Sequence, residues 1–367
     1  MKFTVSTKPL KVAANLAIIK ENVSKLYQRS ILLQLSADKT DLRINTESNS
    51  IFSEVVLKGT GEGEPSTVLI DNLLFKDLIS TINTPQVTID FTANGITLIA
   101  GKSTYALPKI MDSDEIQLVS PDKVENLDSA VDVDRNGWKF IKAHQLFAMA
   151  TSTSNPVYNY VWTGDSDVIV GDYVNSLFTH SESGQMEKPC LLSESIINLL
   201  VSMPDDAKMI AHGDSYTVLV KSDSYEYTAQ FKPLYESEEN GNYNAPIILD
   251  MMTADDSNGI IVNGDEIISA LNQALLLADT KVHNISFIVS SEGVRIKDNR
   301  VDCFIAPENE VNVDTYELTF NPNVLKAVIS ACPESIIKIC PTFADDEVVG
   351  ILVVDKAMTV VLGGLES

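Results

Sequence analysis

The chain has 367 residues, of which 44% are hydrophobic, and its formal net charge is −24. This length can bury several cores of ordinary domain size. No apolar run approaches the roughly 20 residues of a membrane helix, and the first residues lack the apolar stretch of a signal peptide, so we expect a soluble, unexported protein. The acidic balance argues against a surface that grips nucleic acid by its overall charge.

Cysteines and histidines give no sign of a metal or redox centre. The four cysteines include no CxxC pair and mostly stand in apolar contexts that suit reduced thiols, so a cytoplasmic location is expected. The four histidines lack the HxxxH spacing of a zinc site. The sequence also lacks the motifs of serine hydrolases, zinc proteases and kinases. We therefore expect no catalytic residue, no cofactor and no metal ion.

The same order of predicted elements recurs three times along the chain. Each copy begins with a short strand-like segment, at residues 2–6, 131–134 and 259–264. A segment with apolar residues near helical spacing follows, at residues 8–23, 137–152 and 265–280. Alternating segments around a polar turn then predict a hairpin and a further strand, beginning at Leu32, Tyr158 and Ile285.

A second predicted helix completes the pattern in each copy. It opens with a residue whose side chain can cap the helix start, namely Asp71, Ser193 or Asn321. A proline then stops the helix before another strand-like segment, at Pro85, Pro204 or Pro333. The spacing of these prolines is that of tandem globular domains and is too long for a solenoid repeat.

The predicted fold class is α+β, with three tandem domains that each contain two β-α-β-β-β motifs. Polar, weakly periodic linkers place the domains at residues 1–120, 128–245 and 255–367. The second linker contains the apolar run PIILDMM, which a solvated spacer would not need.

Basic residues concentrate on the predicted helices of this acidic chain. Residues 8–29 contain one acidic residue, Glu21, and five basic ones, which are Lys8, Lys11, Lys20, Lys25 and Arg29. Basic residues also outnumber acidic ones at the start of the second domain, at Arg135, Lys139 and Lys142. One interpretation is an ordinary solvated helix face. The other is a set of helices turned toward a polyanion, with the acidic surface facing elsewhere.

The order and spacing of these segments resemble the beta-subunit sliding clamp of bacterial DNA polymerase III over essentially the whole chain. The resemblance lies in the three double motifs, the start MKFTV, the segment GKSTYAL at residues 101–107 and the segment TYELTFNPNVLKAVISAC at residues 315–332. The chain is identified as a divergent member of that family. If a phage encodes it, the expected cytoplasm is that of the host.

The resemblance implies a head-to-tail homodimeric ring, with helices lining a central channel and sheets outside it. Such a ring holds duplex DNA by topology, so its phosphate contacts can be few and weak enough to allow sliding. The basic residues that the resemblance assigns to the channel and its rim are Lys8, Lys11, Lys20, Lys25, Arg29, Lys76, Lys139, Lys142, Lys208 and Lys326.

The family also has an apolar cleft between its second and third domains, where polymerases and the clamp loader dock short hydrophobic peptides. The residues that the resemblance assigns to this cleft are Val157, Asp172, Leu177, Ile247, Ile248, Leu362 and Leu365. Packing between domains is an alternative role for any one of these side chains. The family's Thr-Asp-Gly-His-Arg run is replaced by DYVNSLF at residues 172–178, and its Met-Pro ending by VLGGLES, so we expect a different partner motif.

For the dimer contact, the resemblance assigns Tyr105 and Leu107 of an edge strand to face Leu276 and Leu277 of the other subunit. The implied function is that of a processivity factor without catalysis. Its expected partners are duplex DNA, a replicative polymerase, a clamp loader and a second copy of the chain, and no membrane. A rival hypothesis is a repeat-built structural or assembly protein without DNA binding; an uncharacterised hydrolase is a third. The clamp requires the basic helix faces to converge on one lumen, whereas the assembly protein does not.

Overall fold

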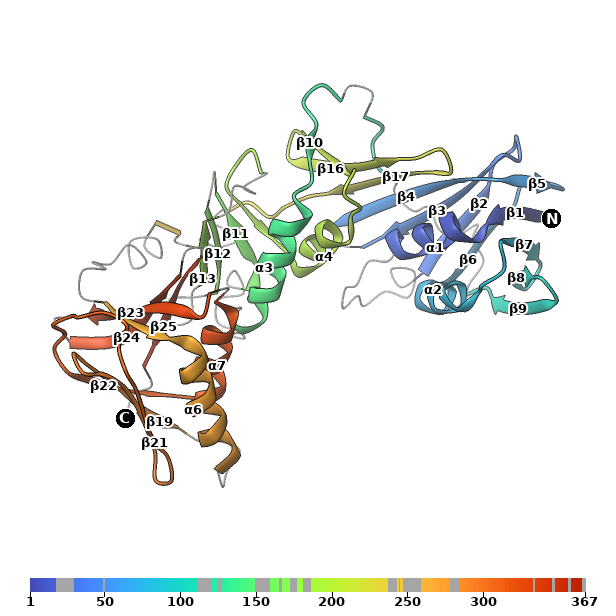
Figure 1. Cartoon of the computed structure of the whole chain (residues 1–367). Coiled ribbons are helices and arrows are strands. Elements are labelled where there is room, and N and C mark those ends of the chain that lie inside the picture. The colour runs from blue at the N-terminus through green and yellow to red at the C-terminus, as the bar shows by residue number, and fades with distance from the viewer. Residues whose placement is uncertain are drawn as a thin grey trace. The chain divides into compact units, whose positions relative to one another are not determined.

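The computed structural model of the chain divides into two compact units (Figure 1). Unit 1 comprises Met1–Trp138 and Glu194–Pro233, and unit 2 comprises Lys139–Ser193 and Leu234–Ser367. The structure describes residues 1–17, 30–48, 50–110, 120–124, 127–148, 159–164, 167–171, 177–180, 186–236, 243, 245–246, 259–277, 284–332, 334–344, 347–355 and 358–364. Within these ranges, no helix is long and apolar enough to cross a membrane.

Unit 1 contains two antiparallel sheets. The five-stranded sheet has the order β5-β1-β7-β8-β9, with strands β1 (Lys2–Ser6), β5 (Thr60–Glu62), β7 (Gln86–Thr92), β8 (Gly95–Ala100) and β9 (Ser103–Pro108). The eight-stranded sheet has the order β10-β15-β16-β17-β4-β3-β2-β6, with strands β2 (Ser30–Leu35), β3 (Asp41–Glu47), β4 (Ile51–Lys58), β6 (Thr67–Asp71), β10 (Val131–Asp132), β15 (Lys208–His212), β16 (Ser215–Lys221) and β17 (Tyr225–Phe231). In the larger sheet, Tyr227 of β17 stands opposite Val55 of β4, so segments far apart in sequence share one hydrogen-bonded surface.

Two short helices of unit 1, α1 (Thr7–Leu16) and α2 (Asn72–Thr81), pack against each other. Each has one buried face, which includes Leu10 and Ala13 on α1 and Phe75 and Ile79 on α2. The predicted cap of α2 is confirmed, because the Asp71 carboxylate accepts a hydrogen bond of 2.7 Å from the backbone N–H of Leu74. The helix predicted over residues 8–23 is observed as far as Leu16, and residues 18–29 lie outside the described part.

The predicted succession of helix, proline and strand is confirmed at two of its three positions. Pro85 follows α2 and comes directly before β7, and Pro204 lies between α4 (Glu194–Ser202) and β15. The third position lies between α7 (Pro322–Ala331) and β23 (Ile336–Ala344), but Pro333 itself is not among the described residues. One further helix, α3 (Arg135–Ala148), begins in unit 1 and ends in unit 2.

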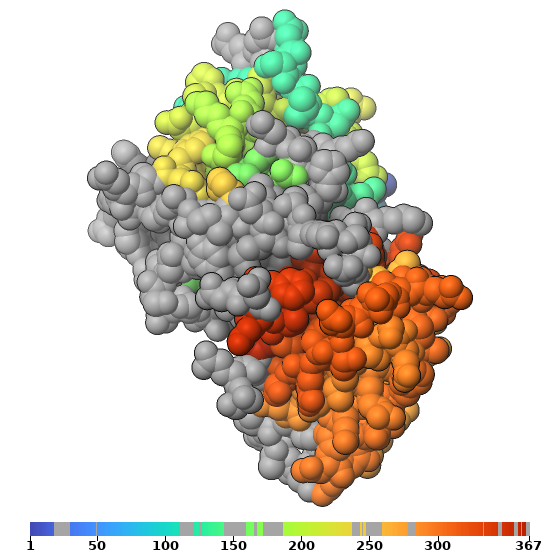
Figure 2. Space-filling view, turned by 90° about the vertical axis from the view of Figure 1, so that its left-hand side faces the viewer, coloured from blue at the N-terminus to red at the C-terminus, as the bar shows by residue number. Residues whose placement is uncertain are grey.

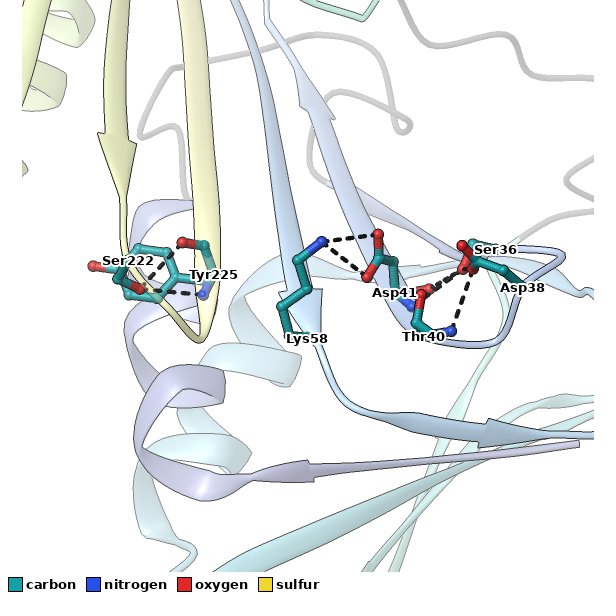
Figure 3. A network of polar contacts seen from close by, with 7 residues as sticks. All are labelled: Ser36, Asp38, Thr40, Asp41, Lys58, Ser222 and Tyr225. Atoms are coloured by element: carbon teal, nitrogen blue, oxygen red, sulfur yellow. Dashed lines mark hydrogen bonds and ion pairs between the residues drawn. The ribbon is translucent and has the colours of Figure 1, made fainter.

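Polar side chains hold the hairpin turns at one end of the larger sheet of unit 1 (Figure 3). Lys58 at the end of β4 donates to both carboxylate oxygens of Asp41 on β3, each at 3.1 Å. In the neighbouring turn, the Ser222 hydroxyl donates to the backbone carbonyl of Tyr225 at 3.1 Å. These contacts fix the ends of strands whose pairing makes the sheet continuous.

Unit 2 also has two antiparallel sheets, and Figure 2 shows part of its surface in orange and red. The eight-stranded sheet has the order β14-β11-β12-β13-β25-β24-β23-β18, with strands β11 (Val161–Thr163), β12 (Asp167–Val170), β13 (Leu177–His180), β14 (Cys190–Leu192), β18 (Ile260–Asn263), β24 (Glu347–Val354) and β25 (Met358–Gly363) beside β23. The four-stranded sheet has the order β21-β20-β19-β22, with strands β19 (Ile285–Ser290), β20 (Gly293–Lys297), β21 (Asp302–Ile305) and β22 (Tyr316–Phe320). Helices α6 (Gly264–Leu277) and α7 pack against each other, as α1 and α2 do.

The two smaller sheets repeat one unusual backbone feature. Gly95 begins β8 with a φ of +138°, and a Cβ atom there would lie 2.1 Å from the carbonyl oxygen of Leu107. Gly293 begins β20 with a φ of +145°, and a Cβ atom there would lie 2.3 Å from the carbonyl oxygen of Ile305. Only glycine fits either position.

The core of unit 2 includes Tyr243, which comes from the acidic segment predicted as the second linker. Its ring is completely buried in a cluster with Trp162, Leu191 and Leu352. Its hydroxyl donates to the carbonyl oxygen of Gly171 at 2.5 Å. A buried tyrosine with a satisfied hydroxyl anchors this part of the segment to the sheet.

The predicted domains at residues 1–120, 128–245 and 255–367 remain predictions. The two compact units divide the chain differently, because residues 139–193 group with the C-terminal part and residues 194–233 with the N-terminal part. Strand pairing explains this grouping: β17 extends the sheet of β4, and β13 extends the sheet of β25.

We predict that Tyr243→Phe lowers the free energy of unfolding by about 1 kcal/mol, because it removes the hydrogen bond to Gly171 and keeps the ring. Tyr243→Ala leaves a cavity and should cost about 3–5 kcal/mol. Urea unfolding followed by tryptophan fluorescence measures both changes. Tyr225→Phe, at a half-buried tyrosine where β17 begins in unit 1, is the control. Equal midpoints for all four proteins would contradict the anchoring role.

Candidate functional site

The channel candidates that the structure describes in unit 1 differ in exposure and in polar contacts. Lys8 on α1 is exposed, and Lys76 on α2 is half-buried. The Lys11 ammonium donates to the carbonyl oxygen of Ser80 at 2.9 Å, in the last turn of α2. A cation there satisfies a terminal carbonyl and complements the helix dipole. Lys208 lies on strand β15 and pairs with Asp132 of the neighbouring strand.

In unit 2, the described candidates lie on two helices. Lys139 is exposed and Lys142 half-buried on α3, and Lys326 is half-buried on α7. The other three candidates, Lys20, Lys25 and Arg29, lie outside the described residues. The assignment of all ten basic residues to the channel stays a prediction.

Three basic residues on strands, Arg43, Lys58 and Arg295, contact a carboxylate of the next strand. Arg43 on β3 contacts Glu54 on β4 at 3.2 Å, and Arg295 on β20 contacts Asp302 on β21 at 3.1 Å. Lys58 is held by Asp41 in the same way. Such exposed pairs contribute little to stability, but they balance positive charge locally on the sheets.

The candidates for the dimer contact lie at an edge strand and at a helix end. Tyr105 is half-buried and Leu107 buried on β9, the last strand of the five-stranded sheet. Leu276 and Leu277 lie in the last turn of α6, with 84% and 44% of their surface exposed. The Arg300 guanidinium donates to the carbonyl oxygen of Leu277 at 2.8 Å, which caps the end of this helix.

The structure adds exposed apolar residues that the sequence interpretation missed. Phe304 is 54% exposed on β21, the end strand of its sheet. Leu73 and Leu74 are 57% and 50% exposed in the first turn of α2. Helical spacing could have identified the two leucines, because the buried stripe of α2 runs through Phe75 and Ile79.

Of the residues assigned to the peptide cleft, the structure describes two. Leu177 lies on β13 opposite Val360 of β25, and Leu362 lies on β25 with its side chain buried. The other five lie outside the described residues: Val157, Asp172, Ile247, Ile248 and Leu365. The cleft therefore stays a prediction.

Burial makes two cysteines unreactive. It is the main reason why the pKa of the Cys190 thiol is raised to about 12. Burial, with a smaller contribution from the negative charge of Asp355, also raises the pKa of Cys332 to about 12. A thiol must lose its proton to act as a nucleophile, so neither is a catalytic candidate.

The architecture matches solved structures along its whole length. The DNA polymerase III beta subunit of Thermotoga maritima matches with a TM-score of 0.77 at 12% identity, covering 100% of this chain and 99% of that one. The DNA polymerase sliding clamp of Bacillus subtilis matches with a TM-score of 0.74 at 16% identity, with the same coverage. The chain has the fold of a sliding clamp.

The beta clamp of Helicobacter pylori, solved with a bound DNA ligase peptide, has the same fold with a TM-score of 0.68 at 14% identity and full coverage of both chains. No protein-family model matches the sequence, and neither does any curated protein. The predicted α+β class and the resemblance to the clamp fold are confirmed. At these low identities the likeness shows the fold alone.

We predict that Lys11→Ala lowers the free energy of unfolding by about 0.5–1 kcal/mol, because it removes the cation from the C-terminal end of α2. Lys8→Ala, on the same helix of the clamp fold, is the matched control and should change stability by no more than about 0.5 kcal/mol. Urea denaturation of the two variants tests this difference. Equal destabilisation by both would show that the contact with Ser80 has no special role.

Proposed function

We propose that the protein is a sliding clamp, a processivity factor that closes as a ring around duplex DNA and tethers a replicative polymerase. The supporting observation is the match of the whole chain, from first residue to last, to clamp structures such as that of Bacillus subtilis. A protein of this kind binds and positions other proteins and catalyses no reaction itself.

In this proposal the ring holds DNA by topology. Lysines of α1, α2, α3 and α7 face the phosphates, and the contacts stay weak enough for the ring to slide. In this proposal the net charge of −24 favours binding in the channel, because the acidic outer surface repels DNA.

The ring needs a second copy of the chain, joined head to tail. The exposed Leu276 and Leu277 at the end of α6 meet the β9 edge with Tyr105 and Leu107 in the other subunit. The two surfaces differ, so the contact is heterologous, and it avoids open filaments because two copies close the ring.

The proposed protein partners are the replicative polymerase and the clamp loader. They dock short peptides at the cleft that includes Leu177 and Leu362. The Helicobacter pylori clamp with its DNA ligase peptide is one case of a clamp that binds a peptide. Because residues 172–178 and the C-terminus here depart from the family pattern, the partner peptides should differ from those of other clamps.

The topological mechanism predicts that the protein, loaded by its clamp loader, stays on a nicked DNA circle through gel filtration and leaves when a restriction enzyme linearises the circle. Loss requires only a free DNA end, so no contact needs to change. Blocking both ends of the linear DNA with bulky proteins should restore retention. Equal retention on circular and open linear DNA would refute the topological mechanism, and no retention on either form would leave the assembly-protein hypothesis.

The dimer assignment predicts that the purified chain has twice the mass of one chain, and that Leu276→Ser shifts it to monomer. Each ring has two identical contacts, so the substitution removes a leucine that the dimer would bury from both of them. The dissociation constant should rise about a hundredfold or more. Sedimentation equilibrium gives the constant. Ile336→Ser is the control, because Ile336 is 44% exposed in unit 2 outside the proposed contact. An unchanged constant for Leu276→Ser would contradict the assignment.

A further inference from the structure

Unit 2 has a small surface pocket. Its described lining contains no residue that was assigned to the channel, the dimer contact or the cleft. Its volume is about 220 Å³, and it is lined by Val313, Tyr316, Pro341, Phe343 and Val348 together with the polar residues Asn312, Asp314 and Thr315. This volume is below the roughly 300–1,000 Å³ of pockets for drug-sized ligands. The pocket therefore suits one bulky side chain better than a whole small molecule.

A bulge in the β23–β24 hairpin shapes one wall of the pocket. The register shifts between Thr342 and Phe343, after which Phe343 stands opposite Val348. The Phe343 side chain is 62% exposed, whereas Val313 on the other wall is buried. A bulge re-aims the side chains that follow it, and here it leaves an aromatic ring at the mouth of the pocket.

Acidic residues flank the pocket residues in the sequence. Residues 301–325, which supply one wall, contain five acidic residues and no lysine or arginine. Residues 339–355, which supply the other wall, contain four acidic residues and no lysine or arginine. Four of these carboxylates are on exposed residues near the pocket in sequence, namely Glu310, Asp314, Glu317 and Glu347. Burial raises the pKa of Tyr316, so its hydroxyl adds no charge.

We propose that this pocket binds a basic segment of a partner protein that carries one bulky apolar side chain. The apolar side chain packs between Val313 and Phe343, and lysines or arginines on either side of it meet carboxylates such as Asp314. An apolar anchor in a small pocket supplies most of the binding energy of such contacts, and the surrounding charges speed association and select the partner. Nucleic acid is excluded, because its phosphates would face these carboxylates.

This inference goes beyond the proposed function, because the contact needs neither the ring nor DNA. The full chain is therefore tested without DNA, by fluorescence polarisation with a labelled pentapeptide that has one phenylalanine between two pairs of lysines. The matched peptide has alanine at the central position. We expect the phenylalanine peptide to bind about tenfold more tightly, as burial of an aromatic side chain requires.

On the protein side, Phe343→Ala should weaken binding of the phenylalanine peptide about tenfold and leave the alanine peptide unaffected. Asp314→Lys should weaken both peptides. The matched controls are Val349→Ala, the neighbouring exposed residue outside the pocket lining, and Glu266→Lys, a charge reversal in the first turn of α6. That turn follows Asn263, which pairs with Ile336 at the end of β23 away from Phe343. Phe343 is exposed, so its variant should unfold at the same urea concentration as the parent.

Three results would overturn the proposal. If the two peptides bind equally, or if Phe343→Ala binds as the parent does, the pocket is not used. If Glu266→Lys weakens binding as much as Asp314→Lys, the peptides respond to overall charge and not to this site. A chain that is monomeric or lost from DNA circles would refute the ring and leave these binding results unaffected.

Discussion

Backbone hydrogen bonding between strands that are far apart in sequence is the constraint on which both units depend. In unit 1, β17 aligns with β4 from Tyr225 opposite Leu57 to Phe231 opposite Ile51. In unit 2, β13 aligns with β25. A strand in the middle of a sheet must pair on both sides, because an unpaired buried N–H or C=O group costs about as much as a lost hydrogen bond. Each eight-stranded sheet is therefore complete only when both of its segments are folded.

Several positive charges of this acidic chain have a carboxylate beside them. Arg43, Lys58 and Arg295 lie on strands beside carboxylates of the next strand, where the charges balance locally. On the helices, Arg135 of α3 likewise contacts Asp205 at 3.2 Å, whereas Lys8 and Lys139 are exposed. A chain with a strongly acidic total can in this way balance some positive charges locally and keep others exposed at its surface.

Local patterns were sufficient to predict the elements and their order. Alternation, the Asp71 cap and the helix stops at Pro85 and Pro204 act within a few residues, so they are visible in the sequence. The pairing of β17 with β4 is not, because it depends on contacts between segments that each satisfy the same pattern. For the same reason the sequence did not show that Lys11 bonds to Ser80 or that Tyr243 leaves an acidic segment to fill a core.

Gly95 and Gly293 also provide a register for comparing the two edge strands that follow them. Gly95 faces the carbonyl of Leu107, and Gly293 faces the carbonyl of Ile305. When these two residues are aligned, Thr104–Leu107 corresponds to Asp302–Ile305. Both stretches read exposed, half-buried, exposed, buried. The edge of one sheet in unit 1 and the edge of one sheet in unit 2 therefore repeat the same pattern of exposure. Any difference in what these two edges can bind must come from the residues by which they differ, and the largest such difference in this stretch is Phe304 in place of Ala106.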